Sequence, residues 1–293
     1  MRLVITADLH YDSPKSRLAT EALAAEICRA GGDALVLAGD SASAMHEPMR
    51  DCLRLFETFP GRRFFVPGNH CIWCLPGEDS MDRYNRILPL LAQECGFVML
   101  DHAPAVLGDV GLAGSIGWYD YSYRDESLGI PLRFYRAKIA PAAAARLSEH
   151  RHLVDEYPDD LTPAGRDIGT RWMDGVRVKM PYSDEEFLDL VVSRLRQQLA
   201  ALQSDDRVRQ VVACTHHVPF RQILPTGRPA AIAFAAAYLG SDRIGEALAG
   251  CDKLTHVYCG HSHWPAREQI GKIQVVNVGS TYYEKRYEVL DLP

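Results

Sequence analysis

Long apolar runs are missing from this 293-residue sequence. No stretch approaches the ~20 consecutive apolar residues that a membrane-spanning helix needs, which excludes a transmembrane helix. Residues 1–8 pass directly into a strand pattern and have neither the long apolar region nor the small-residue cleavage site of a secretory signal. We therefore expect a cytoplasmic protein that is not bound to a membrane.

Runs of basic residues are also lacking. The chain has 32 Lys and Arg against 38 Asp and Glu, which gives a net charge of -6. Binding of a long polyanion depends on many phosphate contacts, so long nucleic acid is a disfavoured partner. The 47% hydrophobic and 24% charged residues are ordinary values for a globular protein.

A disulfide framework is lacking as well. In a chain of this length without a secretory signal, scattered cysteines act as reduced, small hydrophobic residues. Cys71 and Cys74 have the spacing of a redox pair, but the strand before and the helix after that such a site needs are missing. A thiol-redox protein is therefore a minor alternative, and the role of the pair stays open. The eight cysteines are Cys28, Cys52, Cys71, Cys74, Cys95, Cys214, Cys251 and Cys259.

No internal repeat, low-complexity tail or linker divides the sequence, so we expect one domain over residues 1–293. In its first third, short apolar strands alternate with amphipathic helices. The predicted strands cover residues 3–7, 34–38 and 63–66, and the predicted helices cover residues 16–30, 48–59 and 81–95. The first helix is expected to bury Leu18, Ala22, Ala25 and Ile27.

Polar residues follow each of these three strands. Strands that alternate with helices pair in parallel through right-handed crossovers, so their carboxyl ends meet at one edge of the sheet. Ligands and active sites of such sheets lie beyond these ends. We therefore expect convergence of Asp8, His10, Asp40, Asn69 and His70.

The pattern changes after residue 96, where three short segments indicate a second sheet with antiparallel elements. Residues 119–183 show no clear period, and an irregular stretch of this length is usually an insertion; we expect it to cover the active site. A long helix is then predicted over residues 184–201, with Ser183 and Glu186 as its capping box. The three short segments cover residues 97–100, 105–107 and 111–113.

Histidines follow two strands predicted in the last third of the chain. In an extended segment, His261 and His263 point to the same side because their positions differ by two. Two neutral imidazoles that converge in this way are natural ligands for a transition metal. His217 would point away from its neighbour His216, so we expect it behind the ligands or facing the substrate. The strands predicted in this part cover residues 209–215, 255–259, 267–270, 273–278 and 286–290.

Five blocks of the sequence, in this order, resemble the signature of the calcineurin-like metallophosphoesterases: Asp8-Leu9-His10, Gly39-Asp40, Gly68-Asn69-His70, His216 and Gly260-His261-Ser262-His263. One block alone has little weight, but each of the five follows a predicted strand, and together they cover about residues 1–283. The resemblance implies an α/β fold, a four-layer α/β/β/α sandwich of two mixed sheets flanked by helices. Two packed sheets between helices also fit the order of the elements better than one doubly wound sheet.

The resemblance also implies a site with two metal ions. The first would be bound by Asp8, His10, Asp40 and His263, and the second by Asp40, Asn69, His216 and His261. Asp40 would bridge the ions, a hydroxide between them would attack the phosphate ester, and His70 would stabilise the phosphoryl group and protonate the leaving oxygen. This mixed nitrogen and oxygen set suits two divalent transition metals, manganese first and iron, zinc or nickel as alternatives, and does not suit calcium.

The sequence departs from the family pattern next to His70. Many relatives have an acidic residue after the Asn-His pair that orients the histidine, and Cys71 stands there in this sequence. We expect another group to hold His70 in place, either a backbone carbonyl or Asp79.

Substrate contacts are expected from Asn69, His217, Trp118, Tyr119 and Arg124. Aromatic side chains near strand ends, including Trp73 and Tyr123, either wall a pocket or pack in the core. The guanidinium groups of Arg124, Arg221 and Arg228 suit a second phosphate, although solvation at the surface is the simpler interpretation of each.

A small phosphate ester is the expected substrate, and a phosphodiester or nucleotide is preferred because a covered site favours a small molecule. The alternatives are a phosphomonoesterase or protein phosphatase, and a scaffold that kept the fold without catalysis. A scaffold would be expected to have lost ligands or His70, whereas all eight positions of the five blocks are filled. The sequence leaves the oligomeric state open.

Overall fold

A five-stranded sheet forms one half of the computed structural model, which describes residues 1–156, 159–227 and 229–293. Four of its strands are parallel, and the last strand of the chain pairs antiparallel with the first. In spatial order the strands are β11 (Tyr287–Asp291), β1 (Arg2–Thr6), β2 (Ala34–Ala38), β3 (Arg62–Val66) and β4 (Phe97–Met99).

A six-stranded sheet forms the other half. Its four inner strands are parallel, and both edge strands are antiparallel to their neighbours. The segment predicted at residues 97–100 therefore belongs to the first sheet and not the second, because β4 pairs in parallel with β3. The strand order is β5 (Ala105–Leu107), β6 (Val110–Ser115), β7 (Gln210–Thr215), β8 (Leu254–Cys259), β10 (Ile273–Asn277) and β9 (Ala266–Ile270).

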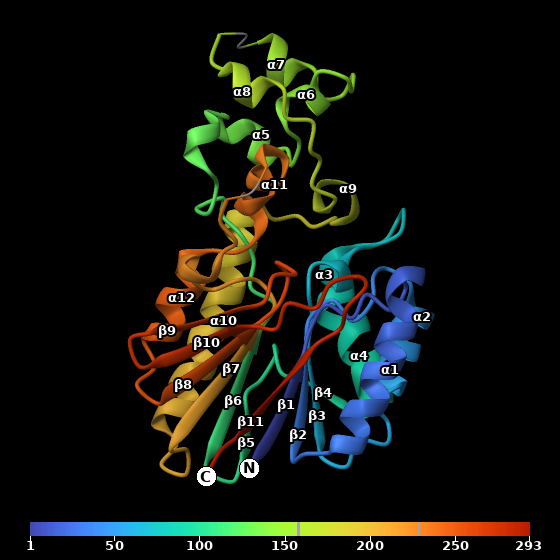
Figure 1. Ribbon diagram of the computed structural model, residues 1–293, viewed down its shortest axis with the longest axis vertical. Coiled ribbons are helices and arrows are strands. Elements are labelled where there is room, and N and C mark those ends of the chain that lie inside the picture. Colours follow the sequence, from blue (N-terminus) through green and yellow to red (C-terminus); the bar gives the residue numbers. More distant parts are fainter. Residues whose placement is uncertain (157–158, 228) are drawn as a thin grey trace.

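The two sheets pack face to face and are covered by helices on their outer faces (Figure 1). Alternate residues of β1 separate the two sides: Leu3 and Ile5 pack between the sheets, and Val4 packs toward the helices. The predicted four-layer α/β/β/α sandwich of two mixed sheets is confirmed. The first sheet is covered by α1 (Pro14–Ala30), α2 (His46–Arg54) and α4 (Leu88–Glu94), and the second by α10 (Asp184–Ser204) and α12 (Asp242–Ala249).

Two helices test the predictions from local sequence. The capping box of α10 is present, with the Ser183 side chain accepting from the Glu186 backbone and the Glu186 side chain accepting in return. The predicted buried face of α1 is confirmed at Ile27 and wrong at Leu18, Ala22 and Ala25: Leu18 is 78% exposed, and Thr20 is buried in its place. Thr20 can be buried because its hydroxyl donates to the Leu9 carbonyl at 3.0 Å, a contact that no helical periodicity reveals.

The predicted insertion contains short helices joined by irregular segments, and it lies beyond the carboxyl ends of the strands (Figure 1). The insertion is tied to the rest by Tyr135, which stacks on Phe234 at 4.7 Å and accepts from the Tyr238 hydroxyl through its carbonyl. The helices here are α5 (Leu132–Arg136), α6 (Pro141–Ala144), α7 (His152–Asp155), α8 (Pro163–Arg166), α9 (Asp174–Arg177) and, from the later chain, α11 (Ala230–Ala235). A further short helix, α3, covers Ser80–Asp82 and continues as a π-helical segment over Arg83–Ile87.

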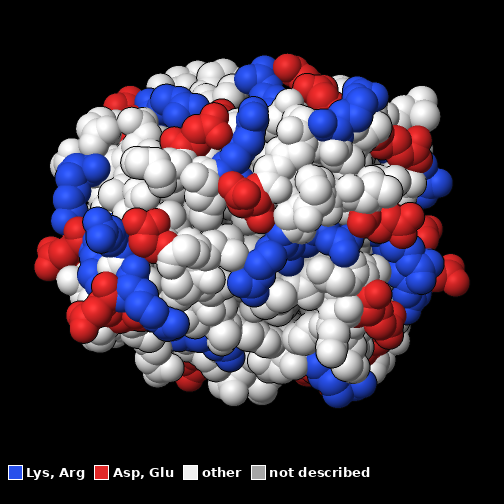
Figure 2. All heavy atoms as spheres, turned by 90° about the horizontal axis from the view of Figure 1, so that it is seen from below, with Lys and Arg blue, Asp and Glu red and all other residues white. Residues whose placement is uncertain are grey.

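Charges of both signs alternate on the face that carries the two chain ends, and no broad basic surface is visible there (Figure 2). Within the described ranges, every helix is too short or too polar to span a bilayer.

Candidate metal centre

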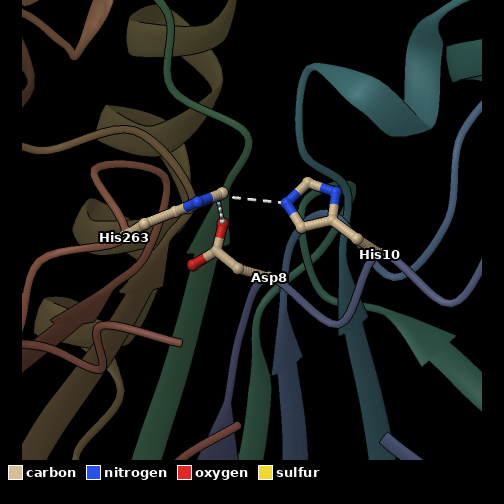
Figure 3. Close-up of side chains that lie close together, drawn as sticks. All are labelled: Asp8, His10 and His263. Carbon is tan, nitrogen blue, oxygen red and sulfur yellow. Dashed lines mark hydrogen bonds and ion pairs between the residues drawn. The ribbon is translucent and has the colours of Figure 1, made fainter. Parts of the chain in front are cut away.

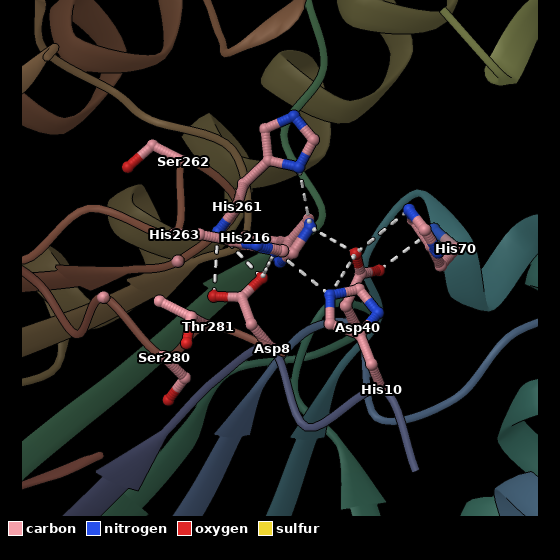
Figure 4. Close-up of polar contacts among 12 residues, drawn as sticks. Asp8, His10, Asp40, His70, His216, His261, Ser262, His263, Ser280 and Thr281 are labelled. Atoms are coloured by element: carbon pink, nitrogen blue, oxygen red, sulfur yellow. Dashed lines mark hydrogen bonds and ion pairs between the residues drawn. The ribbon is translucent and has the colours of Figure 1, made fainter. Parts of the chain in front are cut away.

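Strand ends from both sheets meet at one place, below the insertion (Figure 4). The ends of β1, β2 and β3 in the first sheet and of β7 and β8 in the second bring their polar residues together. The structure thus collects all the predicted ligands together with His70: Asp8, His10, Asp40, Asn69, His70, His216, His261 and His263.

One group of possible ligands consists of Asp8, His10 and His263, which point toward one another (Figure 3). The Nε2 atoms of His10 and His263 are 3.1 Å apart, and His263 Nε2 lies 3.5 Å from Asp8 Oδ1. One ligand atom from each residue lies within 4.8 Å of the others. Such spacing suits donors around a single cation.

A second group consists of Asp40, His216 and His261. His216 Nε2 lies 3.3 Å from Asp40 Oδ2 and 3.1 Å from His261 Nδ1. Asn69 Oδ1 is 3.2 Å from the same His216 nitrogen. Asp40 also joins His10 at 3.8 Å between Oδ2 and Nε2. The Asp40 carboxylate therefore stands between the two groups, where a bridging ligand would be needed.

The backbone is strained at these residues. Seven non-glycine residues of the described ranges have positive φ, and five of them are candidate ligands. Residues in this region cost of order 1–3 kcal/mol each and persist only where the surroundings hold them. The segments are held by hydrogen bonds, such as His10 N–H to the Asp40 carbonyl at 2.8 Å and His261 N–H to the Asp8 carboxylate at 3.0 Å. The five are Asp8 (57°), His10 (43°), Asp40 (49°), His261 (68°) and His263 (56°).

This backbone corrects the predicted geometry of the last two histidines. His261 and His263 do not extend the strand as expected, because both adopt the left-handed conformation. His261 belongs to one ligand group and His263 to the other. The two imidazoles are therefore not a pair that binds one ion.

Glycines allow the backbone to approach the ligands closely. A Cβ at Gly39 would lie 2.1 Å from His216 Nδ1, one at Gly68 would lie 2.2 Å from Asp40 Oδ1, and one at Gly260 would lie 2.4 Å from Asp8 Oδ2. Real Cβ contacts are never this short, so only glycine fits at these positions.

The electrostatics of the site match a cation centre. Burial alone would raise the pKa of Asp40, but the imidazoles of His216, His70 and His10 hold it well below its usual value. Burial lowers the pKa of His10 and of His261 well below the usual range, and nearby imidazoles add to this. The neutral imidazoles of His10 and His261 present lone pairs to a metal, whereas the Asp40 carboxylate outweighs burial and raises the pKa of His216 to about 9, so a metal would displace a proton there. The residues therefore fit divalent transition metals.

His70 forms a further group of possible ligands with His10 and Asp40, beside the two groups above, and 20% of its side chain is exposed. Its backbone N–H donates to Asp40 Oδ1 at 2.9 Å, and its ring stacks on Trp73 with 3.6 Å between the centroids. Asp79 does not orient it, because that carboxylate caps α3 by accepting from the backbone of Met81 and Asp82. The prediction of Asp79 as the partner of His70 is wrong.

Several residues around the centre were missed from the sequence. Tyr282 stacks on His10 at 4.5 Å, and Lys285 Nζ donates to the Asp8 carbonyl at 2.6 Å. Burial lowers the pKa of Lys285 to about 8. Trp172 packs edge-on against His261 at 5.8 Å, and Asp174 accepts from Asn69 Nδ2 at 2.9 Å. These residues come from irregular segments, where no periodic pattern or motif points to them.

Two cavities open from the centre, with volumes of about 1030 Å³ and about 460 Å³. Both ends of the insertion line them: residues 122–127 line the larger cavity, and residues 170–173 line the smaller. The larger one combines charged groups near Arg124 with an apolar wall from residues 232–239, and Trp73 lies in the smaller. The residues common to both are His70, Trp172, Ile232, Ala235 and Tyr282.

The predicted substrate contacts divide into two sets. Arg124 lines the larger cavity and Asn69 lines the smaller. Trp118, Tyr119 and His217 are fully buried and line neither, so substrate contact does not fit their positions. Each has a hydrogen-bond partner in the interior. His217 Nδ1 lies 2.8 Å from the Ile116 carbonyl, the Trp118 indole N–H donates to Asp184, and the Tyr119 hydroxyl donates to Asp174.

The arginines predicted to meet a second phosphate have protein partners. Arg124 donates to Glu126 at 2.7 Å, and Arg221, which also lines the larger cavity, donates to Asp242 at 2.9 Å. Arg228 lies outside the described residues.

The Cys71 and Cys74 thiols are buried and unpaired with each other. Burial raises the pKa of Cys71 to about 12, and Cys74 Sγ lies 3.2 Å from the Arg177 carbonyl. A reactive cysteine needs a lowered pKa and access to solvent, so this environment does not support the thiol-redox alternative.

Comparison with known proteins agrees with this geometry. The sequence matches the calcineurin-like phosphoesterase family over residues 1–265, and no curated protein matches it. Phosphopantetheinyl hydrolase from Mycobacterium tuberculosis has 18% identity and a TM-score of 0.63, with 98% of this chain and 95% of that one covered. TT1561 from Thermus thermophilus has 13% identity and a TM-score of 0.52, with 99% and 98% covered. These likenesses show a shared fold, and the family match spans most of the sequence, so the chain belongs to the calcineurin-like phosphoesterase family of metal-dependent phosphohydrolases.

Proposed function

We propose that this phosphohydrolase acts on a phosphodiester of a small molecule or nucleotide, with two divalent metals in the centre. The observation that carries the choice of a diester is the pair of cavities that meet at His70. A diester has two substituents on its phosphorus, and each cavity can take one of them. A monoester has a single substituent and would leave one cavity unused.

The two groups of donors support the proposed ligand sets. Asp8, His10, Asp40 and His263 would hold the first metal, and Asp40, Asn69, His216 and His261 the second. Two metals in such a site polarise a phosphoryl oxygen and make water a strong nucleophile at neutral pH. Carboxylate, imidazole and amide donors suit manganese, with iron, zinc or nickel as alternatives.

His70 is the residue proposed to move a proton. It is partly exposed at the junction of the cavities, and its Nε2 lies 3.9 Å from Asp40 Oδ2, so its ring borders the space between the donor groups and the substrate. From there the imidazolium form can donate to the oxygen that leaves the phosphorus. Asp40 would act as a ligand shared by the two metals.

Only the two ends of the insertion would lie over the site, because they alone, among its described residues, line the cavities. Residues 122–127 and 170–173 wall the cavities, whereas α6, α7 and α8 stand farther from the strands (Figure 1). Walls on both sides favour a small substrate over a folded phosphoprotein. We retain one domain, residues 1–293, as the simplest organisation.

The test is hydrolysis of a bis-aryl and a mono-aryl phosphate by chelator-stripped protein reloaded with manganese. We expect manganese to restore cleavage, faster for the diester, and Asp40→Asn to lose metal and activity together. Faster monoester cleavage would favour the phosphatase alternative. No cleavage of either ester by protein that holds two metals would favour a scaffold. Because one structural neighbour is named a phosphopantetheinyl hydrolase, a phosphopantetheinyl diester belongs in the second round of substrates.

A further inference from the structure

Asp174 is a buried carboxylate at the carboxyl-terminal end of the insertion, outside both ligand groups, and only 1% of its surface is exposed. It accepts hydrogen bonds from four side chains, three of which lie between 55 and 105 positions away from it in the sequence. Two of the donors follow β3, and two belong to the insertion. The donors are Asn69 Nδ2 at 2.9 Å, Trp73 Nε1 at 2.6 Å, Tyr119 Oη at 3.0 Å and Trp172 Nε1 at 2.8 Å.

The contact with Asn69 decides which way that amide points. A carboxylate only accepts hydrogen bonds, so the NH₂ group of Asn69 has to face Asp174. The amide oxygen then faces the centre, where it lies 3.2 Å from His216 Nε2. The oxygen is the atom that can bind a metal, whereas the NH₂ group cannot. Asp174 therefore sets Asn69 in the orientation that makes it a ligand.

The contact with Trp73 reaches His70. The indole N–H of Trp73 is bound to Asp174 Oδ1, and the same ring lies 3.6 Å from the His70 ring at an angle of 22°. A ring fixed by a hydrogen bond is a firm support for the imidazole that stacks on it. No acidic residue follows His70 directly, since Cys71 occupies that position.

We propose that Asp174 is a positioning residue for the metal centre: it orients Asn69 for the second metal and fixes Trp73 against His70. In this chain Cys71 follows His70, and the carboxylate that supports His70 comes from the insertion and acts through the Trp73 indole. The assignment rests on the proposed function, because it gives Asn69 and His70 their roles.

Asp184 offers a matched control. It is also buried, with 5% exposed, and it also accepts from a tryptophan, Trp118 Nε1, at 2.8 Å, together with Tyr121 and Lys138. Its donors lie outside the ligand groups. Removing either carboxylate leaves buried donors without an acceptor, so Asp174→Ala and Asp184→Ala should both lower the unfolding temperature.

The experiment is calorimetric titration of chelator-stripped protein with manganese, for wild type and both variants. We expect Asp174→Ala to weaken one of two manganese sites by about 10- to 100-fold, the usual effect of losing a partner of a metal ligand, and Asp184→Ala to weaken neither. Equal manganese affinities in the two variants would overturn the role of Asp174 while leaving the proposed function intact. A wild-type protein without two manganese sites would overturn both.

A second variant tests the assignment if Asp174→Ala does not fold. Trp73→Phe removes the indole N–H that binds Asp174 and keeps an aromatic ring beside His70. We expect kcat to fall about tenfold, as for other losses of this kind, with both manganese affinities unchanged; KM is not diagnostic here, because Trp73 also lines the smaller cavity. If this variant keeps the wild-type kcat, Asp174 does not position His70 through Trp73.

Discussion

Replacing Gly68 by alanine should remove at least one metal from the centre, although Gly68 carries no ligand atom. A Cβ added there would lie 2.2 Å from Asp40 Oδ1 and 2.7 Å from His216 Nε2. Favourable contacts of carbon lie at about 3.5–4.0 Å, so these two side chains would have to move by about 1 Å or more. Both belong to the same ligand group, and Asp40 is the proposed bridge between the metals.

The backbone of Gly68 does not itself require glycine, since its φ lies outside the left-handed region, so the substitution tests the close approach alone. A displacement of about 1 Å at a catalytic site can cost about 100-fold in rate. We expect Gly68→Ala to lose at least one metal and at least this much activity.

The assay combines metal analysis after dialysis with hydrolysis of the preferred aryl phosphate. Gly169→Ala is the control, because a Cβ at Gly169 meets nothing within 4 Å. The reasoning is refuted if Gly68→Ala holds two metals and keeps wild-type turnover, since the ligands would then have room that the structure does not show.

Two further predictions concern single histidines. His70→Ala should leave both metals bound and lower kcat by about 100-fold or more, as expected for the loss of a general acid; metal analysis that finds the centre empty would contradict the division of roles between His70 and the ligands. His102 tests the pH dependence of stability. Burial, with a smaller effect from Arg194, lowers the pKa of His102 from 6.5 to about 4 in the folded protein. The unfolded chain therefore binds a proton at His102 before the folded protein does, and the contribution of His102 to the free energy of unfolding, complete above pH 6.5, is lost as the pH falls toward 4. Between pH 7 and pH 4.5, the free energy of unfolding should therefore fall less in His102→Gln than in the wild type, by of order 1 kcal/mol in denaturant titrations. His46→Gln is the control, because His46 is exposed. Equal losses in all three proteins would contradict this role of His102.

The proposed ligands were predictable because of where they stand in the chain. Asp8, Asp40 and Asn69 follow short apolar strands, and parallel strands must end at the same edge of a sheet. The order of the strands and helices was similarly readable, as was the start of α10 at Ser183. These features depend on local periodicity and on rules for connecting neighbouring elements.

Other features could not be read locally. The pairing of β4 with β3 was missed because a three-residue strand carries no pattern that selects its partner. The buried face of α1 was misjudged because burial of Thr20 depends on an acceptor at Leu9, outside the helix. The conformations of His261 and His263 were misjudged because the backbone turns left-handed directly after the strand.

The sequence by itself determined the family and the four layers and predicted the residues proposed to bind metal, since each of these follows from motifs at the ends of regular strands. Only the tertiary structure decided what surrounds them: the two cavities, the interior positions of Trp118, Tyr119 and His217, and the carboxylate of Asp174. Asp174 meets Asn69 across 105 positions of sequence, from a segment without periodicity. Contacts of this kind are fixed by the packing of the whole chain, because no local preference of either segment specifies the other.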